Sequence, residues 1–123
     1  MGILDSFRLD GKVALVTGVG RGLGQAMAVG LAEAGADVAG LFLSKYSETQ
    51  KQVLLLGKTF LPVQCDLRNA SVEEIGQVVD TVVAAMGSLD ILVNNAGIIR
   101  RTPALEYTEE DWDAVTQVNM KSL

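Results

Sequence analysis

The chain has 123 residues, of which 49% are apolar, and its 10 Lys and Arg against 15 Asp and Glu give a formal net charge of −5. Because it holds no His and one Cys, a Ser-His-Asp triad, a His-containing metal site and a disulfide framework are excluded, and we expect no metal site. The acidic balance leaves no basic face for a nucleic acid backbone. The longest apolar runs fall far below the roughly 20 residues that cross a bilayer. The lone Cys65 is typical of a reducing compartment. We therefore expect a cytoplasmic protein with neither nucleic acid nor membrane as partner.

Short β-branched runs alternate with longer helical patterns along the chain, which is typical of βαβ units on a parallel sheet. Strands are expected at 12–17, 37–43, 59–64 and 89–93, and helices at 25–34, 46–56, about 71–86 and from about 108 onward. Capping boxes are predicted for Ser71 with Glu74 and for Thr108 with Asp111. The pattern predicts an α/β fold, a doubly wound parallel sheet of about four strands with helices on both faces.

The last predicted helix lacks the residues that usually end a helix. No Gly, Pro or charge run closes the last predicted helix before Leu123. The fourth strand would also be an uncovered edge, which is a pairing liability. We therefore expect one domain over 1–123, truncated inside the helix that starts near Thr108.

A glycine cluster joins the first predicted strand to the first predicted helix. The segment Thr17–Gly24 reads T-G-x-x-x-G-x-G, with glycines at 18, 22 and 24. Glycines there allow a tight turn and a close approach of a pyrophosphate to the backbone N–H groups of the helix start. The alternative is a glycine-rich turn without a ligand. A Walker A loop is excluded, because no Gly-Lys-Ser/Thr occurs.

This loop, together with Asn94-Asn95-Ala96-Gly97 after the fourth predicted strand, resembles the short-chain dehydrogenase/reductase family. The resemblance covers the whole chain, from Leu9 through Asp66-Leu67 to Val118-Asn119. It implies the N-terminal half of a Rossmann fold, and hence one dinucleotide-binding domain. For the complete protein it implies hydride transfer to or from a nicotinamide dinucleotide.

The resemblance also implies roles for particular positions. In the family the glycine loop holds the pyrophosphate, an Asp-Leu pair after the third strand contacts adenine, and the Asn-Ala-Gly segment packs beside the ribose. A helix Asn holds, through its backbone, a water of the proton relay. The cofactor-binding positions implied here are Gly18, Arg21, Gly22, Leu23, Gly24, Asp66, Leu67, Asn95, Ala96 and Gly97, and the catalytic position implied is Asn119.

The stretch 94–121 is similar to a branch of the family that acts on sugar acids of the 2-deoxy-D-gluconate or 2-dehydro-3-deoxy-D-gluconate type. Such substrates carry a carboxylate, which arginine binds through a bidentate fork. Arg100 and Arg101 are therefore candidate substrate-binding residues. The alternative for this pair is a solvated loop that aids solubility.

The catalytic Tyr-x-x-x-Lys of the family, with its upstream Ser, is absent. The residues four positions beyond Tyr46 and Tyr107 are Gln50 and Asp111. In the family the Lys lowers the pKa of the Tyr, so that the phenolate can take a proton from the substrate. Family members carry these residues beyond position 123, and we predict that the 123-residue polypeptide is inactive. The alternatives to an oxidoreductase are a non-catalytic dinucleotide-binding module and an inactive fragment.

The choice of dinucleotide is open from the residues. An NAD enzyme usually places an acid at the end of the second strand to bind the ribose 2′-OH, but that position is Phe42. Arg21 and Lys45 are positioned in the sequence to receive a 2′-phosphate, which favours NADP. The sugar-acid branch implies NAD. NAD is our prediction, with NADP left open.

Two further expectations concern the last helix and the cysteine. In the family the last helix contributes to a subunit interface, which implies a homo-oligomer, a tetramer or a dimer. Its apolar face would be formed by Trp112, Val115, Val118 and Met120. Cys65 has no basic neighbour in the sequence, so we expect a buried thiol rather than a nucleophile.

Overall fold

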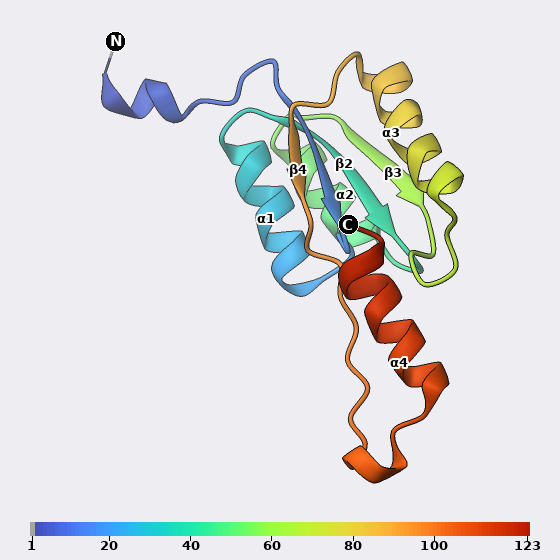
Figure 1. Ribbon diagram of the computed structural model, residues 1–123. Helices are drawn as coiled ribbons and strands as arrows, with labels where there is room; N and C mark the ends of the chain where they lie inside the picture. Colours follow the sequence, from blue (N-terminus) through green and yellow to red (C-terminus); the bar gives the residue numbers. More distant parts are fainter. Residues whose placement is uncertain (1) are drawn as a thin grey trace.

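The computed structural model describes residues 2–123, and a four-stranded parallel sheet in the order β3-β2-β1-β4 lies at its centre (Figure 1). The strands are β1 (Val13–Thr17), β2 (Asp37–Phe42), β3 (Phe60–Gln64) and β4 (Ile91–Val93). The helices are α1 (Gly22–Glu33), α2 (Ser47–Leu55), α3 (Val72–Met86) and α4 (Glu109–Thr116). Short helical segments cover Ile3–Phe7, Ala104–Glu106 and, as a π-helical continuation of α4, Gln117–Lys121. Within residues 2–123, none of the helices has both the length and the apolar character needed to cross a bilayer.

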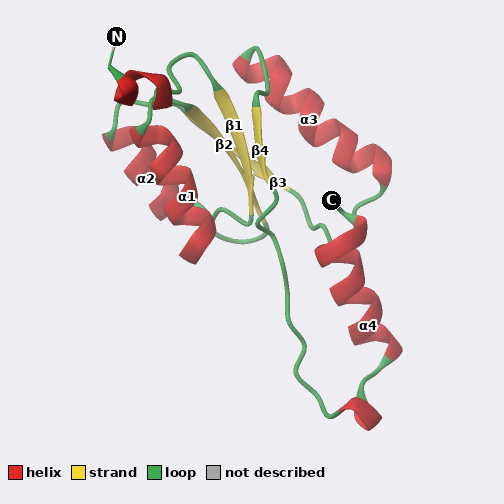
Figure 2. Ribbon diagram, turned by 60° about the vertical axis from the view of Figure 1, so that its left-hand side comes forward, coloured by secondary structure: helices red, strands yellow, loops and turns green. Residues whose placement is uncertain are grey.

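Helices cover both faces of the sheet, with α1 and α2 on one side and α3 and α4 on the other (Figure 2). Alternate residues of the strands supply the two cores, because successive side chains of a strand point to opposite faces. Val13 and Leu15 of β1 pack with Val78 and Val82 of α3, whereas Val16 belongs to the cluster under α1 and α2. The predicted doubly wound α/β fold with about four strands is therefore confirmed.

Helix α1 begins inside the glycine cluster, at Gly22, and not at position 25 as the sequence pattern predicts. Glycine has a low helix propensity, which favours a start after the last glycine. Packing decides otherwise, since Gly24 is buried against the end of β1 as part of the first helical turn. The local preference is overridden by a tertiary contact.

The two predicted capping boxes differ in outcome. Ser71 and Glu74 form a complete box, with N–H···O distances of 3.1 Å and 3.0 Å, and α3 ends at Gly87, whose φ is +90°. At α4, Thr108 Oγ1 accepts the Asp111 N–H at 3.1 Å, but the Asp111 carboxylate turns toward Arg100, 3.6 Å away. The predicted box at Thr108 is therefore only half right.

The predicted apolar residues of the last helix differ in burial. Ala114 and Val118 are buried and lie one turn apart. Trp112 and Met120 are 62% and 66% exposed. They lie away from the buried side that Ala114 and Val118 define.

A carboxylate joins the amino ends of β1 and β4. Asp90 Oδ2 accepts the Val13 N–H at 2.9 Å and the Ser88 hydroxyl at 3.0 Å. The hydrogen bond from Val13, followed by that from Ser88, lowers the pKa of Asp90 below that of an ordinary aspartate. Because the ionised form makes these bonds better than the protonated form, Asp90 contributes stability that depends on pH.

We expect Asp90→Asn to flatten the loss of stability in acid. The contribution of Asp90 is complete above the pKa of an unfolded aspartate, about 3.9. It declines as the pH falls below that value toward the lowered pKa of the folded state. The asparagine carbonyl can still accept the Val13 N–H but does not titrate. Urea unfolding between pH 7 and pH 3 measures this, and equal pH slopes for the two proteins would contradict it.

Candidate functional site

The carboxyl ends of all four strands meet at one edge of the sheet. Thr17 lies beside Leu41, Phe42 beside Gln64, and Val16 beside Val93, so the strands end in register. The chain order reverses here, since β1 is flanked by β2 on one side and by β4 on the other. In open parallel sheets ligands bind in the crevice at such a reversal, outside the carboxyl ends.

Hydrogen bonds between Thr17 and Asn95 join the end of β1 to the segment after β4. Thr17 Oγ1 accepts the N–H groups of Asn95 and Ala96 at 3.0 Å and 2.9 Å, and it donates to Val93 O at 3.4 Å. The Asn95 side-chain amide donates to the carbonyls of Thr17 and Gly18, both at 3.2 Å. The glycine loop and the Asn-Ala-Gly segment, some seventy residues apart in sequence, are thus held together.

Two of the predicted glycines are required by close packing. Gly18 has φ +68°, and a Cβ there would lie 3.1 Å from Ala96 Cα. A Cβ on Gly24 would overlap the Gly18 carbonyl oxygen and lie 2.7 Å from Asn95 Nδ2. Any side chain at Gly24 would therefore push α1 away from β1 and disturb the Asn95 amide.

Gly22 has a different role from its neighbours. Its φ is +58°, a conformation that favours glycine, and nothing lies within 4 Å of the position that a Cβ would take. The N-terminus of α1 therefore opens on free space, where the first N–H groups of the helix attract an anion. The Leu23 side chain is 75% exposed.

A cavity of about 620 Å³ lies over the glycine loop. Its lining brings predicted cofactor residues together with the chain that follows β2, including Gly22, Arg21, Asn95, Ser44 and Lys45. Arg21 and Lys45 are both exposed and line this one cavity, as a shared 2′-phosphate site requires.

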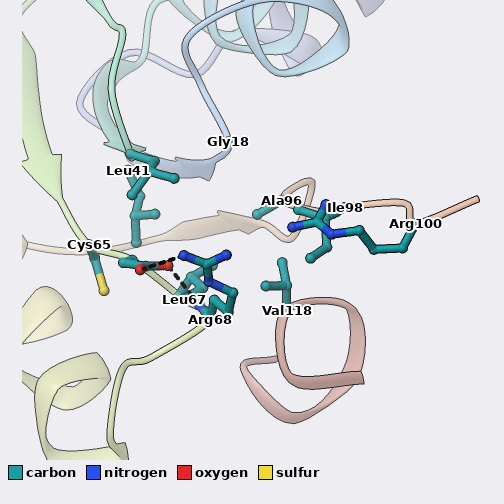
Figure 3. A pocket seen from close by; sticks show the side chains of 12 residues that line it. Gly18, Leu41, Cys65, Leu67, Arg68, Ala96, Ile98, Arg100 and Val118 are labelled. Atoms are coloured by element: carbon teal, nitrogen blue, oxygen red, sulfur yellow. Dashed lines mark hydrogen bonds and ion pairs between the residues drawn. The ribbon is translucent and has the colours of Figure 1, made fainter. Parts of the chain in front are cut away.

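A second cavity, of about 240 Å³, adjoins the first and shares Gly18, Leu43, Ala96 and Gly97 with it (Figure 3). Asp66, Leu67, Val118 and Arg100 are among its other lining residues. The Asp66 carboxylate is fixed by its own loop, because Oδ1 accepts the Arg68 N–H at 3.0 Å and Oδ2 accepts the Asn69 amide at 2.7 Å. The predicted adenine-contacting pair, Asp66 and Leu67, therefore shares one cavity with Ala96 and Gly97.

Cys65 also lines the second cavity and is half-buried. Burial raises the pKa of its thiol, and the carboxylates of Glu74 and Asp66 add to the effect. The thiol therefore stays protonated near neutral pH and is a poor nucleophile.

The role of the Asn119 side chain was missed by sequence reasoning, which gave it no function beyond the resemblance. Asn119 Oδ1 accepts the Ile98 N–H at 2.9 Å, and its Nδ2 donates to the Ile98 carbonyl at 3.0 Å. Both bonds fix the loop after β4 against the π-helical segment Gln117–Lys121. Asn119 lies in the irregular, π-helical end of the last helix, and no pattern of turn residues marks this segment. Periodicity alone therefore does not reveal the role of the Asn119 side chain.

The two candidate substrate arginines differ in surroundings. Arg100 borders the second cavity, with its Nε 3.6 Å from Asp111 Oδ1 and its side chain 38% exposed. Arg101 is exposed. Arg100 therefore lies on the same cavity as Asp66 and Leu67.

A parallel sheet with a glycine-rich, anion-attracting helix start at its topological switch defines a dinucleotide-binding protein of the Rossmann type. The family model described as short chain dehydrogenase matches residues 12–123, and the chain belongs to this family. It is 51% identical over 98% of its length to 2-dehydro-3-deoxy-D-gluconate 5-dehydrogenase of Escherichia coli (strain K12), covering 47% of that protein. It is 43% identical over its whole length to the Bacillus subtilis (strain 168) protein of the same name, covering 48%.

Among solved structures, the chain is 40% identical to a short chain dehydrogenase from Burkholderia cenocepacia J2315 in complex with NADP, with a TM-score of 0.88. That match covers 94% of this chain and 47% of the other. The chain thus spans about half the length of the relatives it matches. The family resemblance predicted from the two motifs is confirmed.

We expect Gly24→Ala and Gly30→Ala, two changes in the same helix, to have opposite effects. The Cβ at Gly24 would meet the Gly18 carbonyl, and we expect a loss of about 1–3 kcal/mol or more in the free energy of unfolding, together with weaker dinucleotide binding. Nothing lies within 4 Å of the Cβ position at Gly30, so alanine should stabilise the helix by about 0.5–1 kcal/mol. Denaturant unfolding measures both, and equal effects would contradict the packing argument.

Proposed function

We propose that the complete protein is an NAD(P)-dependent oxidoreductase that binds a nicotinamide dinucleotide across the two adjoining cavities. The open N-terminus of α1 at Gly22, in a loop held by the Thr17–Asn95 bonds, carries this proposal. The pyrophosphate would accept N–H bonds at Gly22 and Leu23. The adenosine would lie toward Asp66 and Leu67 in the second cavity. When bound, the nicotinamide ring supplies the acceptor or donor of a hydride.

The remaining predicted residues would hold or shape the site in which the cofactor binds. Asn95 keeps the ribose side of the site in place through its bonds to the carbonyls of Thr17 and Gly18. Ala96 and Gly97 line both cavities with little side-chain volume. Asn119 fixes the loop that follows them by its two bonds to Ile98. Its backbone is the part that the family resemblance assigns to the proton relay.

We propose a sugar acid as the substrate of the complete protein, of the 2-dehydro-3-deoxy-D-gluconate or 2-deoxy-D-gluconate type. The support is the identity of 51% to the Escherichia coli enzyme that is named for this substrate. A substrate carboxylate would need a bidentate partner, for which Arg100 and Arg101 are the candidates in the loop after β4. For the complete protein we also propose a homo-oligomer, a tetramer or a dimer, in line with the exposed Trp112 and Met120 on the last helix.

Of the two dinucleotides left open by the sequence, the cavity over the glycine loop favours NADP. Arg21 and Lys45 both line it, and a 2′-phosphate would form charge-assisted hydrogen bonds with them. The strand end that would carry an acid for NAD is Phe42. The Burkholderia cenocepacia relative contains NADP, which supports the same choice.

We expect Arg21→Ala to weaken NADPH binding by about 10- to 100-fold, the value of a hydrogen bond between charged groups, and to leave NADH binding nearly unchanged. Isothermal titration of the protein expressed from its natural gene measures both. Lys51→Ala is the matched control, because Lys51 is exposed on α2 away from the cavity lining. An equal loss for both dinucleotides would contradict a 2′-phosphate contact. No binding of either would overturn the proposed function.

We further expect the 123-residue polypeptide to show no turnover of 2-deoxygluconate with NAD(H) or NADP(H). Neither Tyr46 nor Tyr107 has a lysine four positions on, so neither has the Tyr-x-x-x-Lys spacing that would let it exchange a proton with the substrate. Dinucleotide binding without turnover by this polypeptide fits both the oxidoreductase and the second candidate function, a non-catalytic binding module, and turnover by the protein expressed from its natural gene separates the two. Absorbance at the reduced nicotinamide band measures turnover, and a rate above blank would contradict the expectation.

A further inference from the structure

Two arginine side chains border the second cavity. Arg68 comes from the loop after β3 and Arg100 from the loop after β4, and both line the cavity. Figure 3 shows their guanidinium groups extending from these two loops toward the space between Leu41, Ala96 and Val118. Neither residue belongs to the glycine loop or to the group facing a 2′-phosphate. The presence of two cationic side chains on one cavity of about 240 Å³ calls for a functional explanation.

Neither guanidinium is saturated by the acid beside it. Arg68 Nη2 lies 4.0 Å from Asp66 Oδ2 and Arg100 Nε lies 3.6 Å from Asp111 Oδ1. Both distances exceed that of a good hydrogen bond. The two side chains are 49% and 38% exposed, so part of each remains accessible to a ligand. A guanidinium plane with a free face stacks on aromatic rings.

The rest of the lining selects the kind of ligand. The walls are largely aliphatic, formed by Leu41, Leu67, Ile98 and Val118. Apolar walls with cationic planes at the rim suit a flat, uncharged aromatic ring, whose faces are apolar and electron-rich. A sugar acid is neither flat nor apolar, and its hydroxyl groups would be left without partners against these walls.

The second cavity adjoins the cavity over the glycine loop and shares Gly18, Leu43, Ala96 and Gly97 with it. A ring in it would therefore belong to the same ligand whose phosphates lie at the start of α1. We propose that Arg68 and Arg100 stack on the adenine of the dinucleotide and close the cavity over it, so that they set a preference for a purine base. This inference rests on the proposed function. It gives Arg100 a role on the cofactor instead of on the substrate carboxylate.

The test compares two ligands of equal charge, adenosine diphosphate and uridine diphosphate. We expect Arg68→Met and Arg100→Met each to lower the ratio of the uridine to the adenosine dissociation constant by about three- to tenfold, the range of a cation–π contact. Arginines that merely attract phosphates would change both constants equally and leave the ratio unaltered. Arg8→Met is the matched control, since Arg8 is exposed and lies outside the linings of both cavities, and its ratio should equal that of the unmodified protein.

The protein expressed from its natural gene is used, and titration with NADPH is run beside the diphosphates. If NADPH and adenosine diphosphate bind but neither arginine variant changes the base ratio, the stacking role is overturned and the proposed function stands. If the unmodified protein binds no dinucleotide, both are overturned. A raised KM for the sugar acid in Arg100→Met, with unchanged affinity for adenosine diphosphate, would overturn the cofactor role of Arg100. Arg68→Lys and Arg100→Lys keep the charge without the plane, and we expect them to restore the ratio only in part.

Discussion

The hydroxyl of Thr17 organises the site, because it accepts two backbone N–H groups from the segment after β4 while Asn95 returns bonds to the end of β1. These groups are partly buried, and leaving them without partners would cost about 1–3 kcal/mol each. The bonds connect two turns that are distant in sequence and therefore fix the separation between the two walls of the binding crevice. Both cavities are bordered by residues on each side of this connection.

Glycines on the same loop act in two opposite ways around that connection. Gly24 lets α1 approach the Gly18 carbonyl so closely that no side chain fits, and this contact seats the helix on the strand end. Nothing lies within 4 Å of the position that a Cβ on Gly22 would take, and its missing side chain leaves the helix N-terminus accessible. One glycine thus sets the position of the anion-attracting N–H groups, and the other keeps the space before them free. The spacing of T-G-x-x-x-G-x-G reflects both demands.

The fold was largely predictable because each strand and helix carries a local signal, such as the capping box at Ser71 and the buried apolar run 13–17. The start of α1 was not, because contact with Gly18 outweighs the helix propensity of glycine. The glycine loop could be recognised from the sequence, since its residues are contiguous. The Asn119–Ile98 bonds and the place of Arg100 depend on how two remote segments pack, and no pattern within either segment encodes that.

The net charge of this protein is negative, whereas several cationic side chains border its two cavities. A charge of −5 opposes broad binding to a polyanion. Yet the cations Arg21, Lys45, Arg68 and Arg100 all border the two cavities at the carboxyl edge of the sheet. Asp66 and Asp111 lie 4.0 Å and 3.6 Å from Arg68 and Arg100 and offset part of the charge of these two arginines. Arg21 and Lys45 line the cavity over the glycine loop, where they act on a bound anion at short range. An acidic protein can therefore attract a small anionic cofactor to this edge while it repels larger polyanions elsewhere.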